Sequence, residues 1–298
     1  MTNSIAPIDR LAISFCADRH YIAFAPAAIE SILRHYDGSR GLPFFHLVTD
    51  VELNSDTTRA LEDLCSGHYK VHVIDASVFD EYKEVTHISR AMYYRLLLPS
   101  IISERRVLYL DCDVLVRKDL SSLASIDMSG NIVGAVRNPF YDVSRIGFAD
   151  GDIYFNSGVL LIDRALWVAH LITPRTRSYI EENMQSLWMP DQDALNFILR
   201  NKWLELDPTF NCQTSMFVFH QALRSELSPT WQTDFLEDPA IVHFSSGHKQ
   251  WHTSCRSIYS SDYISLKHHK VVPRKGPLLD AVISLHRLLK YWKNPYFT

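Results

Sequence analysis

The sequence has few features of an extracellular or membrane-spanning protein. Its N-terminal residues, MTNSIAPIDR, lack a basic start and a long apolar run, and no segment reaches the roughly 18 apolar residues of a membrane span. The cysteines are odd in number, scattered and free of Cys-x-x-Cys spacing, which argues against a disulfide framework or a zinc site; they are Cys16, Cys65, Cys112, Cys212 and Cys255. We therefore expect a cytosolic protein in a reducing compartment.

The chain also lacks a basic excess, but its charge is unevenly distributed. Residues 256–298 contain eight Lys or Arg and two Asp, a net charge of +6, so residues 1–255 must carry −10 to give the total of −4. The acidic main body disfavours nucleic acid as a partner. The shift in composition predicts a boundary near residue 256 between a main domain, 1–255, and a basic C-terminal segment, 256–298.

Apolar segments of strand and helix type alternate through the main domain. Their patterns predict strands over 11–15, 44–48, 71–74, 107–111, 132–136, 158–162 and 241–244, and helices over 21–35, 57–65, 89–98 and 194–199. This alternation predicts an α/β fold with a mostly parallel sheet and a ligand site outside the carboxyl ends of the strands. No GxGxxG motif follows the first strand, so an ordinary dinucleotide-binding fold is not indicated.

Residues 107–116, VLYLDCDVLV, place Asp111 and Asp113 where a buried strand ends. In an extended chain residues i and i+2 point to the same side, so both carboxylates would face one point. Hard oxygen ligands suit Mg²⁺ or Mn²⁺, which keep open positions for the phosphates of a substrate. A strand-end turn with two solvated acids is the alternative interpretation.

Polar residues gather at two further element boundaries. Asn156 and Ser157 precede Gly158 and an apolar strand, where an amide suits a polyhydroxyl ligand and glycine allows close approach of the backbone. Asp191 and Gln192 stand at a helix start. A turn leading into the strand explains the first group equally well, and helix capping explains the second.

Two other segments carry groups suited to a metal or a nucleotide. His243 ends an apolar strand, and its neutral imidazole is a competent Mn²⁺ ligand, while Lys249 is placed to neutralise a phosphate. Asp18, after the first strand, is placed to accept hydrogen bonds from a base or ribose, and Tyr21 to stack on a ring. A purely structural role for His243 is the alternative interpretation.

As an ordered set these segments resemble glycosyltransferase family 8, most closely its bacterial lipopolysaccharide galactosyltransferases and glucosyltransferases. The resemblance runs from about residue 11 to residue 255 and rests on FCADRHY, HISRAMYYRLLLP, VLYLDCDVLV, ADGDIYFNSGVLLID, PDQDALN and HFSSGHKQWH. It implies a GT-A fold with a mixed, mostly parallel sheet. It also implies transfer of a hexose, galactose or glucose, from a UDP-sugar to a saccharide acceptor of lipopolysaccharide or another glycoconjugate, with retention of anomeric configuration.

The resemblance also implies roles for individual residues. Asp111, Asp113 and His243 would hold Mn²⁺, with Mg²⁺ as the alternative, while Asp191 and Gln192 would lie at the reacting carbon. The donor-binding residues implied by the same segments are Cys16, Asp18, Tyr21, His87, Ile88, Arg95, Cys112, Asn156, Ser157 and Lys249. Trp251 would be a packing neighbour of this site.

The chain departs from the family pattern in places. The glycine after His243 is displaced by one position to Gly247, and the usual proline is Gln250, although the spacing from His243 to Lys249 is kept. Ser157 stands where alanine is frequent. We therefore rely on His243 and Lys249 rather than on backbone contacts of this loop.

Retention allows two mechanisms. One uses a covalent intermediate on a carboxylate such as Asp191, and the other uses departure and attack on the same face, with the leaving phosphate drawing the acceptor's proton. Gln192 is a poor nucleophile, which favours same-face displacement. Rival functions are a metal-dependent phosphohydrolase, disfavoured because Val114 and Leu115 follow the acids far into the chain, and a non-catalytic nucleotide-sugar-binding protein.

The C-terminal segment predicts a helical appendage over 277–296. An apolar stripe at three- and four-residue spacing is formed by Leu278, Leu279, Val282, Leu285, Leu289 and Trp292, and Arg287, Lys290 and Lys293 lie off it. This pattern is typical of an in-plane helix on an anionic membrane. A lipid-linked acceptor at the inner face of a membrane would fit it, and a helix packed on the main domain is the alternative.

Overall fold

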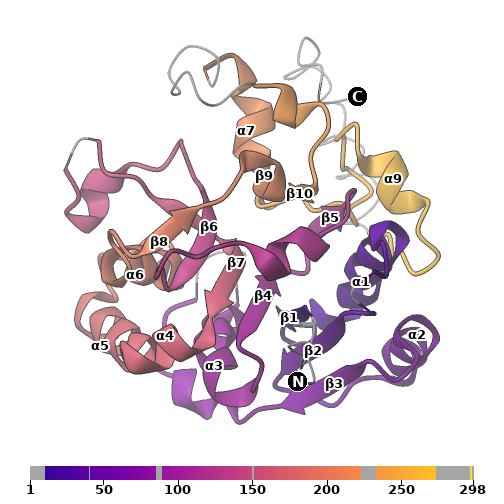
Figure 1. The fold of residues 1–298 in the computed structure, drawn as a ribbon, viewed down its shortest axis with the longest axis horizontal. Helices are drawn as coiled ribbons and strands as arrows, with labels where there is room; N and C mark the ends of the chain where they lie inside the picture. Colours follow the sequence, from indigo (N-terminus) through magenta and orange to yellow (C-terminus); the bar gives the residue numbers. More distant parts are fainter. Residues whose placement is uncertain are drawn as a thin grey trace, which may run out of the picture.

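A seven-stranded mixed sheet forms the centre of the computed structural model, which describes residues 11–39, 41–84, 89–149, 151–222, 233–272 and 296. The strand order is β3-β2-β1-β4-β7-β6-β8 (Figure 1). Neighbouring strands are parallel except where β7 pairs with β4 and β6. The strands are β1 (Ala12–Cys16), β2 (Phe44–Thr49), β3 (Tyr69–Val73), β4 (Arg106–Leu110), β6 (Val133–Arg137), β7 (Phe155–Asp163) and β8 (Trp203–Glu205).

A smaller sheet of three strands lies beside it, in the order β5-β10-β9. These strands are β5 (Val114–Val116), β9 (Cys212–Gln213) and β10 (Ile241–His243). Strand β5 starts directly after Asp113, and β10 runs antiparallel to it with His243 opposite Val114. The small sheet therefore carries His243 to the two acids from far along the chain.

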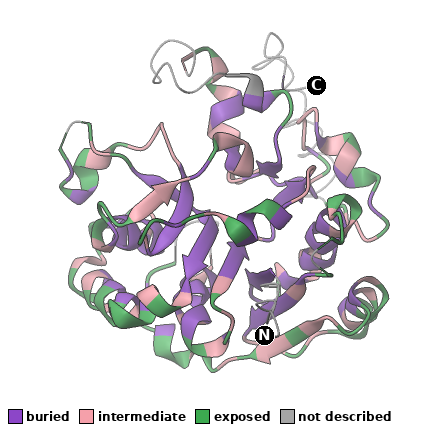
Figure 2. Ribbon diagram, in the orientation of Figure 1, coloured by how far each residue is buried: buried purple, intermediate pink, exposed green. Residues whose placement is uncertain are grey.

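Helices cover both faces of the large sheet (Figure 1), and its strands are mostly buried (Figure 2). Leu108 and Leu110 of β4 join a buried cluster with α1 and α2, whereas Val107 and Tyr109 join a second cluster with α4, α5 and α6. The helices are α1 (Ala25–His35), α2 (Ser55–Cys65), α3 (Leu98–Ile101), α4 (Arg164–Ala169), α5 (Ile172–Asn183), α6 (Pro190–Ile198), α7 (Thr214–Val218) and α9 (Ser260–Ile264). The 3₁₀ helices are η1 (Ile22–Phe24), η2 (Ala76–Phe79), η3 (Arg90–Leu97), η4 (Ser121–Ser125), η5 (Val143–Ile146), η6 (Pro208–Asn211) and η7 (Thr233–Leu236).

Two of the predicted helices are present but contain 3₁₀ turns. The segment 21–35 begins with the 3₁₀ turn η1, and α1 starts at Ala25 because Pro26 favours the first turn of a helix. The segment 89–98 is the 3₁₀ helix η3, which leads into α3. Nearly every residue of η3 is buried, so no polar face in the sequence distinguishes a three-residue period from a 3.6-residue period.

Residues just beyond the predicted boundary at 256 pack against the main body. Tyr259, Tyr263 and Leu266 belong to the same buried cluster as α1. Most of the predicted appendage over 277–296 lies outside the described residues. Its described residue, Tyr296, is buried and its ring centroid lies 5.3 Å from that of Phe217. The boundary itself stays a prediction. Among the described residues, we find no helix with the length and apolar character of a membrane span.

Glu30 fastens this C-terminal stretch to α1. Its carboxylate accepts hydrogen bonds from the backbone N–H of Lys267 at 2.9 Å and of His268 at 2.8 Å, and from Arg34 at 2.8 Å. Burial by itself would raise the pKa of Glu30, but the hydrogen bonds from Lys267 and His268 lower it below its usual value. The ionised carboxylate therefore stabilises the folded state.

We expect Glu30→Gln to lower the free energy of unfolding at pH 7 by about 1–3 kcal/mol, because two backbone donors lose a charged acceptor. The pKa of Glu30 is lowered by folding, so its stabilisation is present above the unfolded pKa of about 4.3 and is lost as the pH falls through the folded pKa. Urea unfolding at pH 7 and pH 3.5 should show the difference shrinking at the lower pH. The exposed Glu62→Gln on α2 is the control, and equal stability of Glu30→Gln and wild type at pH 7 would refute this role.

Candidate active site

Most of the predicted site residues line one cavity of about 120 Å³, at the carboxyl ends of β1 and β4. Strand β7 begins there because it runs antiparallel to β4, and the Asp111 N–H donates to the Gly158 carbonyl at 2.9 Å. The predicted residues that line this cavity are Cys16, Tyr21, Arg95, Asp111, Cys112, Asp113, Asn156, Ser157, Asp191, Gln192, His243 and Lys249. Asp18 lines an adjoining cavity, and His87 and Ile88 lie outside the described residues.

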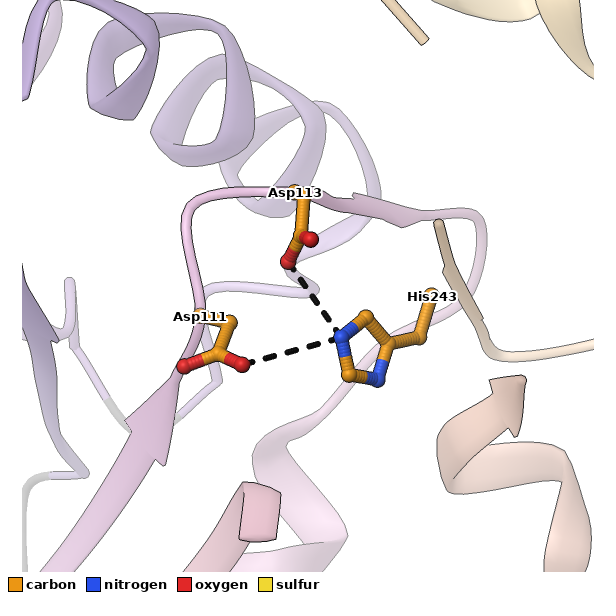
Figure 3. A group of neighbouring side chains, drawn as sticks. All are labelled: Asp111, Asp113 and His243. Carbon is orange, nitrogen blue, oxygen red and sulfur yellow. Dashed lines mark ion pairs between the residues drawn. The ribbon is translucent and has the colours of Figure 1, made fainter. Parts of the chain in front are cut away.

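Asp111, Asp113 and His243 form a convergent group of metal-ligating side chains (Figure 3). The acids lie in the turn between β4 and β5, so the expectation of an extended strand end was wrong, yet both face the imidazole. The His243 Nε2 atom lies 3.7 Å from Asp111 Oδ2 and 3.2 Å from Asp113 Oδ1. One ligand atom from each residue falls within 4.8 Å of the others.

Each acid gives one oxygen to the protein and turns the other toward this group. Asp111 Oδ1 accepts hydrogen bonds from Tyr109 and Arg95, and Asp113 Oδ2 accepts one from Lys249. Asp113 Oδ1 is buried and has no hydrogen-bond donor within the described residues. Two carboxylate oxygens and one imidazole nitrogen are a fitting ligand set for Mn²⁺ or Mg²⁺.

Positive charge offsets the cost of burying Asp113. Burial alone would raise its pKa, but the Lys249 ammonium beside it holds the pKa well below its usual range. Lys249 also donates to the Phe244 carbonyl at 3.1 Å, which fixes its ammonium at the cavity wall. Asp113 is thus ionised at neutral pH and able to bind a cation.

Arg95 connects Asp111 to the far side of the cavity. Its guanidinium is buried, donates to Asp111 at 3.1 Å and to the Ser157 carbonyl at 2.6 Å, and lies 3.3 Å from Asp191 Oδ2. It also lies over the Tyr109 ring, 4.6 Å from the centroid. A single arginine therefore holds two acids from different elements in fixed positions.

Asp191 and Gln192, at the start of α6, are each only 3% exposed. Burial raises the pKa of Asp191 to about 6, although Arg95 opposes this shift. The side-chain oxygen of Gln192, Oε1, accepts hydrogen bonds from the Ser157 N–H at 2.9 Å and from Asn156 Nδ2 at 3.1 Å. Its side-chain nitrogen, Nε2, donates to the Tyr154 hydroxyl at 3.0 Å. Gln192 is thus held in a fixed position beside Asp191.

The residues predicted to precede β7 are part of it. Asn156 and Ser157 lie inside the strand, so the interpretation as a turn was wrong. The Asn156 carbonyl oxygen accepts from the Gly158 N–H at 3.0 Å and from Asn211 at 2.9 Å. Ser157 Oγ accepts from Arg95 at 2.9 Å and lies 3.3 Å from Asp191 Oδ2. These side chains thus hold the cavity wall together.

The end of the cavity predicted to bind the nucleotide is also held by hydrogen bonds and aromatic contacts. Asp18 Oδ1 accepts from the backbone N–H groups of His20 at 2.8 Å and Tyr21 at 3.1 Å, which shapes the loop after β1. Tyr21 makes an edge contact with Trp251 at 5.7 Å, and Trp251 stacks on Phe24 at 3.9 Å. Burial raises the pKa of the Cys16 and Cys112 thiols, which therefore stay neutral.

Several residues of the site gave no signal in the sequence. Asn211 hydrogen-bonds His243, Tyr109 hydrogen-bonds Asp111, and Tyr154 joins Gln192 to Asp193. Tyr109 and Tyr154 lie in or next to apolar runs and look like core residues, and Asn211 has no motif around it. Only the pairing of distant elements identifies them.

Comparison with known proteins gives a consistent result. The sequence model described as "Glycosyl transferase family 8" matches residues 12–255. The chain is 31% identical to general stress protein A of Bacillus subtilis over 83% of this chain and 90% of that protein. It is 26% identical to the lipopolysaccharide glucosyltransferase WaaO of Escherichia coli over 81% of this chain and 73% of that one. The crystal structure of the galactosyltransferase LgtC, in complex with donor and acceptor sugar analogs, matches with a TM-score of 0.76 at 26% identity, covering 89% of this chain and 98% of that one. This likeness confirms the predicted GT-A fold.

We expect Gly158→Ala to disrupt the metal-ligating group. A Cβ atom at Gly158 would lie 2.3 Å from His243 Cε1 and 2.6 Å from Asp111 Oδ2, so both ligands must move. Titration calorimetry should show Mn²⁺ affinity lowered at least about tenfold.

Gly134→Ala, in the neighbouring strand β6, is the control for this substitution. Its Cβ would lie 3.1 Å from Cδ2 of the flexible Leu206 side chain and 3.5 Å from Leu161 Cβ, and it would touch no metal-ligating residue, so Mn²⁺ affinity should be kept. Unchanged affinity in Gly158→Ala would contradict the assignment of these ligands.

Proposed function

The chain belongs to glycosyltransferase family 8, and from that premise we propose that it is a retaining hexosyltransferase that uses a UDP-hexose donor. The observation that supports this most is the single cavity in which the metal-ligating group, Lys249, Arg95 and Asp191 meet. Relatives named above include a glucosyltransferase and a galactosyltransferase, and we propose glucose or galactose as the hexose. A saccharide or lipid-linked saccharide, of lipopolysaccharide or another glycoconjugate, would be the acceptor.

We assign the metal site to Mn²⁺, with Mg²⁺ as the alternative, held by Asp111, Asp113 and His243. When bound, the cation supplies positive charge that stabilises the diphosphate of the departing UDP. Lys249, on the same side of the cavity, adds a second positive charge for the diphosphate. This charge stabilises the transition state more than the ground state because the leaving group gains negative charge as the bond breaks.

The remaining residues bind and orient the donor. Cys16, Asp18, Tyr21 and Cys112 would lie around uridine, and the family resemblance assigns His87 and Ile88 to the donor site as well. Arg95, Asn156, Ser157 and Asp191 would surround the sugar, and Gln192 would lie beneath its anomeric carbon. These roles follow the family resemblance, and they are supported by the cavity that all of these residues except Asp18, His87 and Ile88 line.

Same-face displacement is the mechanism we favour. The bond from the anomeric carbon to the β-phosphate oxygen breaks, an acceptor hydroxyl oxygen bonds to that carbon on the same face, and its proton passes to the departing phosphate. Asp191, the carboxylate available for a covalent intermediate, is already engaged by Arg95 at 3.3 Å, and Gln192 is hydrogen-bonded through both its amide oxygen and its amide nitrogen. Their role is to hold charge and position around the reacting carbon.

The basic C-terminal segment supports a further proposal about location. Its apolar stripe and flanking lysines and arginines suit an in-plane contact with anionic lipid at the inner face of a membrane. A lipid-linked acceptor would be presented there.

We expect the wild-type protein with Mn²⁺ to release UDP slowly from one member of a UDP-sugar panel, with water as the acceptor. Asp113→Asn should lose this release because the cation loses an anionic ligand, whereas the exposed Asp56→Asn should keep it. Coupled detection of UDP measures both. Full turnover in excess chelator would exclude the metal assignment, and donor binding without any release would favour a non-catalytic protein.

The membrane contact is tested by the triple variant Arg287→Glu, Lys290→Glu, Lys293→Glu, which retains Tyr296, a buried residue that a truncation would remove. Because each basic residue near anionic lipid contributes about 1 kcal/mol, we expect sedimentation with anionic vesicles to weaken about 100-fold or more. UDP release should be unchanged.

The matched control reverses the same number of charges on the main domain, at the exposed Arg59, Lys70 and Lys202. This control variant should sediment like wild type. Equal loss in both triple variants would indicate a nonspecific charge effect and no C-terminal membrane contact.

A further inference from the structure

His243 is hydrogen-bonded on the side away from the two acids by Asn211, a residue that lies in none of the motifs quoted from the sequence. Its Nδ1 atom lies 2.9 Å from Oδ1 of Asn211, the last residue of η6. Asn211 is fully buried, so water does not compete for this contact. The other ring nitrogen, Nε2, faces Asp111 and Asp113.

Backbone donors fix which end of the Asn211 amide faces the histidine. The Gly158 N–H donates to the Asn156 side chain at 3.0 Å, so that atom is the carbonyl oxygen. Asn211 meets the same oxygen at 2.9 Å and must present its NH₂ group to it. The carbonyl oxygen of Asn211 is therefore the atom that faces His243.

A second backbone donor gives the same assignment independently. The Ser157 N–H donates to the Gln192 side chain at 2.9 Å, so that atom is the Gln192 carbonyl oxygen. Asn156 meets this oxygen at 3.1 Å through its NH₂ group, which leaves its own carbonyl oxygen for Asn211. The order of donors and acceptors from Gln192 to His243 is thus determined along its whole length.

A carbonyl oxygen only accepts hydrogen bonds, so Nδ1 carries a proton, and in the neutral imidazole that binds a metal the lone pair then lies on Nε2. This lone pair points at Asp111 Oδ2 and Asp113 Oδ1. Three electron-donating atoms then face one another, an arrangement that a cation stabilises and that the other tautomer would oppose with an N–H group.

We propose that Asn211 is a positioning residue that holds His243 in the Nδ1–H tautomer and so makes Nε2 a metal ligand. The inference rests on the metal site proposed above. Through Asn156 the same hydrogen bonds reach Gln192, so Asn211 also joins the metal side of the cavity to the sugar side.

Mn²⁺ binding without donor, measured by electron paramagnetic resonance of the free ion, tests this role. Asn211→Ala should weaken affinity about 10- to 100-fold, because partners of metal ligands contribute in that range. Asn211→Asp keeps an acceptor for His243 Nδ1 and should stay closer to wild type than Asn211→Ala does. Asn196→Ala is the matched control. Asn196 is equally buried, but its side chain bonds to the backbone of Phe155 and to the backbone carbonyl of Gln192, so this variant should bind Mn²⁺ like wild type.

A second measurement on the wild-type protein does not depend on any variant folding. Nitrogen-15 spectra of histidine-labelled protein with diamagnetic Mg²⁺, in which the His243 signals are identified by their loss in His243→Gln, should place the proton on Nδ1. A proton on Nε2, or equal Mn²⁺ affinity in Asn211→Ala and wild type, would overturn the role of Asn211 but leave the proposed metal site intact. A wild-type protein that binds no Mn²⁺ would overturn the proposed metal site as well.

Discussion

The mutual repulsion of three acids in one small cavity is the constraint on which the site depends. Asp111, Asp113 and Asp191 line the same space, and two of them are nearly fully buried. Arg95 lies between Asp111 and Asp191, and Lys249 pairs with Asp113. The remaining oxygens of Asp111 and Asp113 converge with His243, so the protein concentrates negative charge at a point where a divalent cation fits.

The topology of the sheet explains how distant segments meet at this point. Strand β7 is antiparallel to β4, which places its first residues beside the carboxyl end of β4. The pairing of β5 with β10 brings His243 across from a second sheet. The absence of a side chain at Gly158 leaves the space that the imidazole and Asp111 occupy. Fold and charge thus act on the same few atoms.

Much of this arrangement is predictable from the sequence. The remainder cannot be predicted, and the reasons are physical. Local patterns predict most strands of the large sheet, and the ordered motifs predict the family, because both signals lie within short segments. The direction of β7, the small sheet and the contact of Asn211 with His243 depend on pairings between residues far apart in the chain. The 3₁₀ character of η3 is likewise hidden, since its burial on all sides removes the periodic pattern.

The most direct test of the central claim is an anomalous difference map from crystals soaked with Mn²⁺ and UDP. We expect a peak bonded to Asp111, Asp113 and His243 Nε2, with further ligands from the diphosphate. A map with no peak at these three side chains, or with Mn²⁺ bound to UDP elsewhere in the cavity, would contradict it.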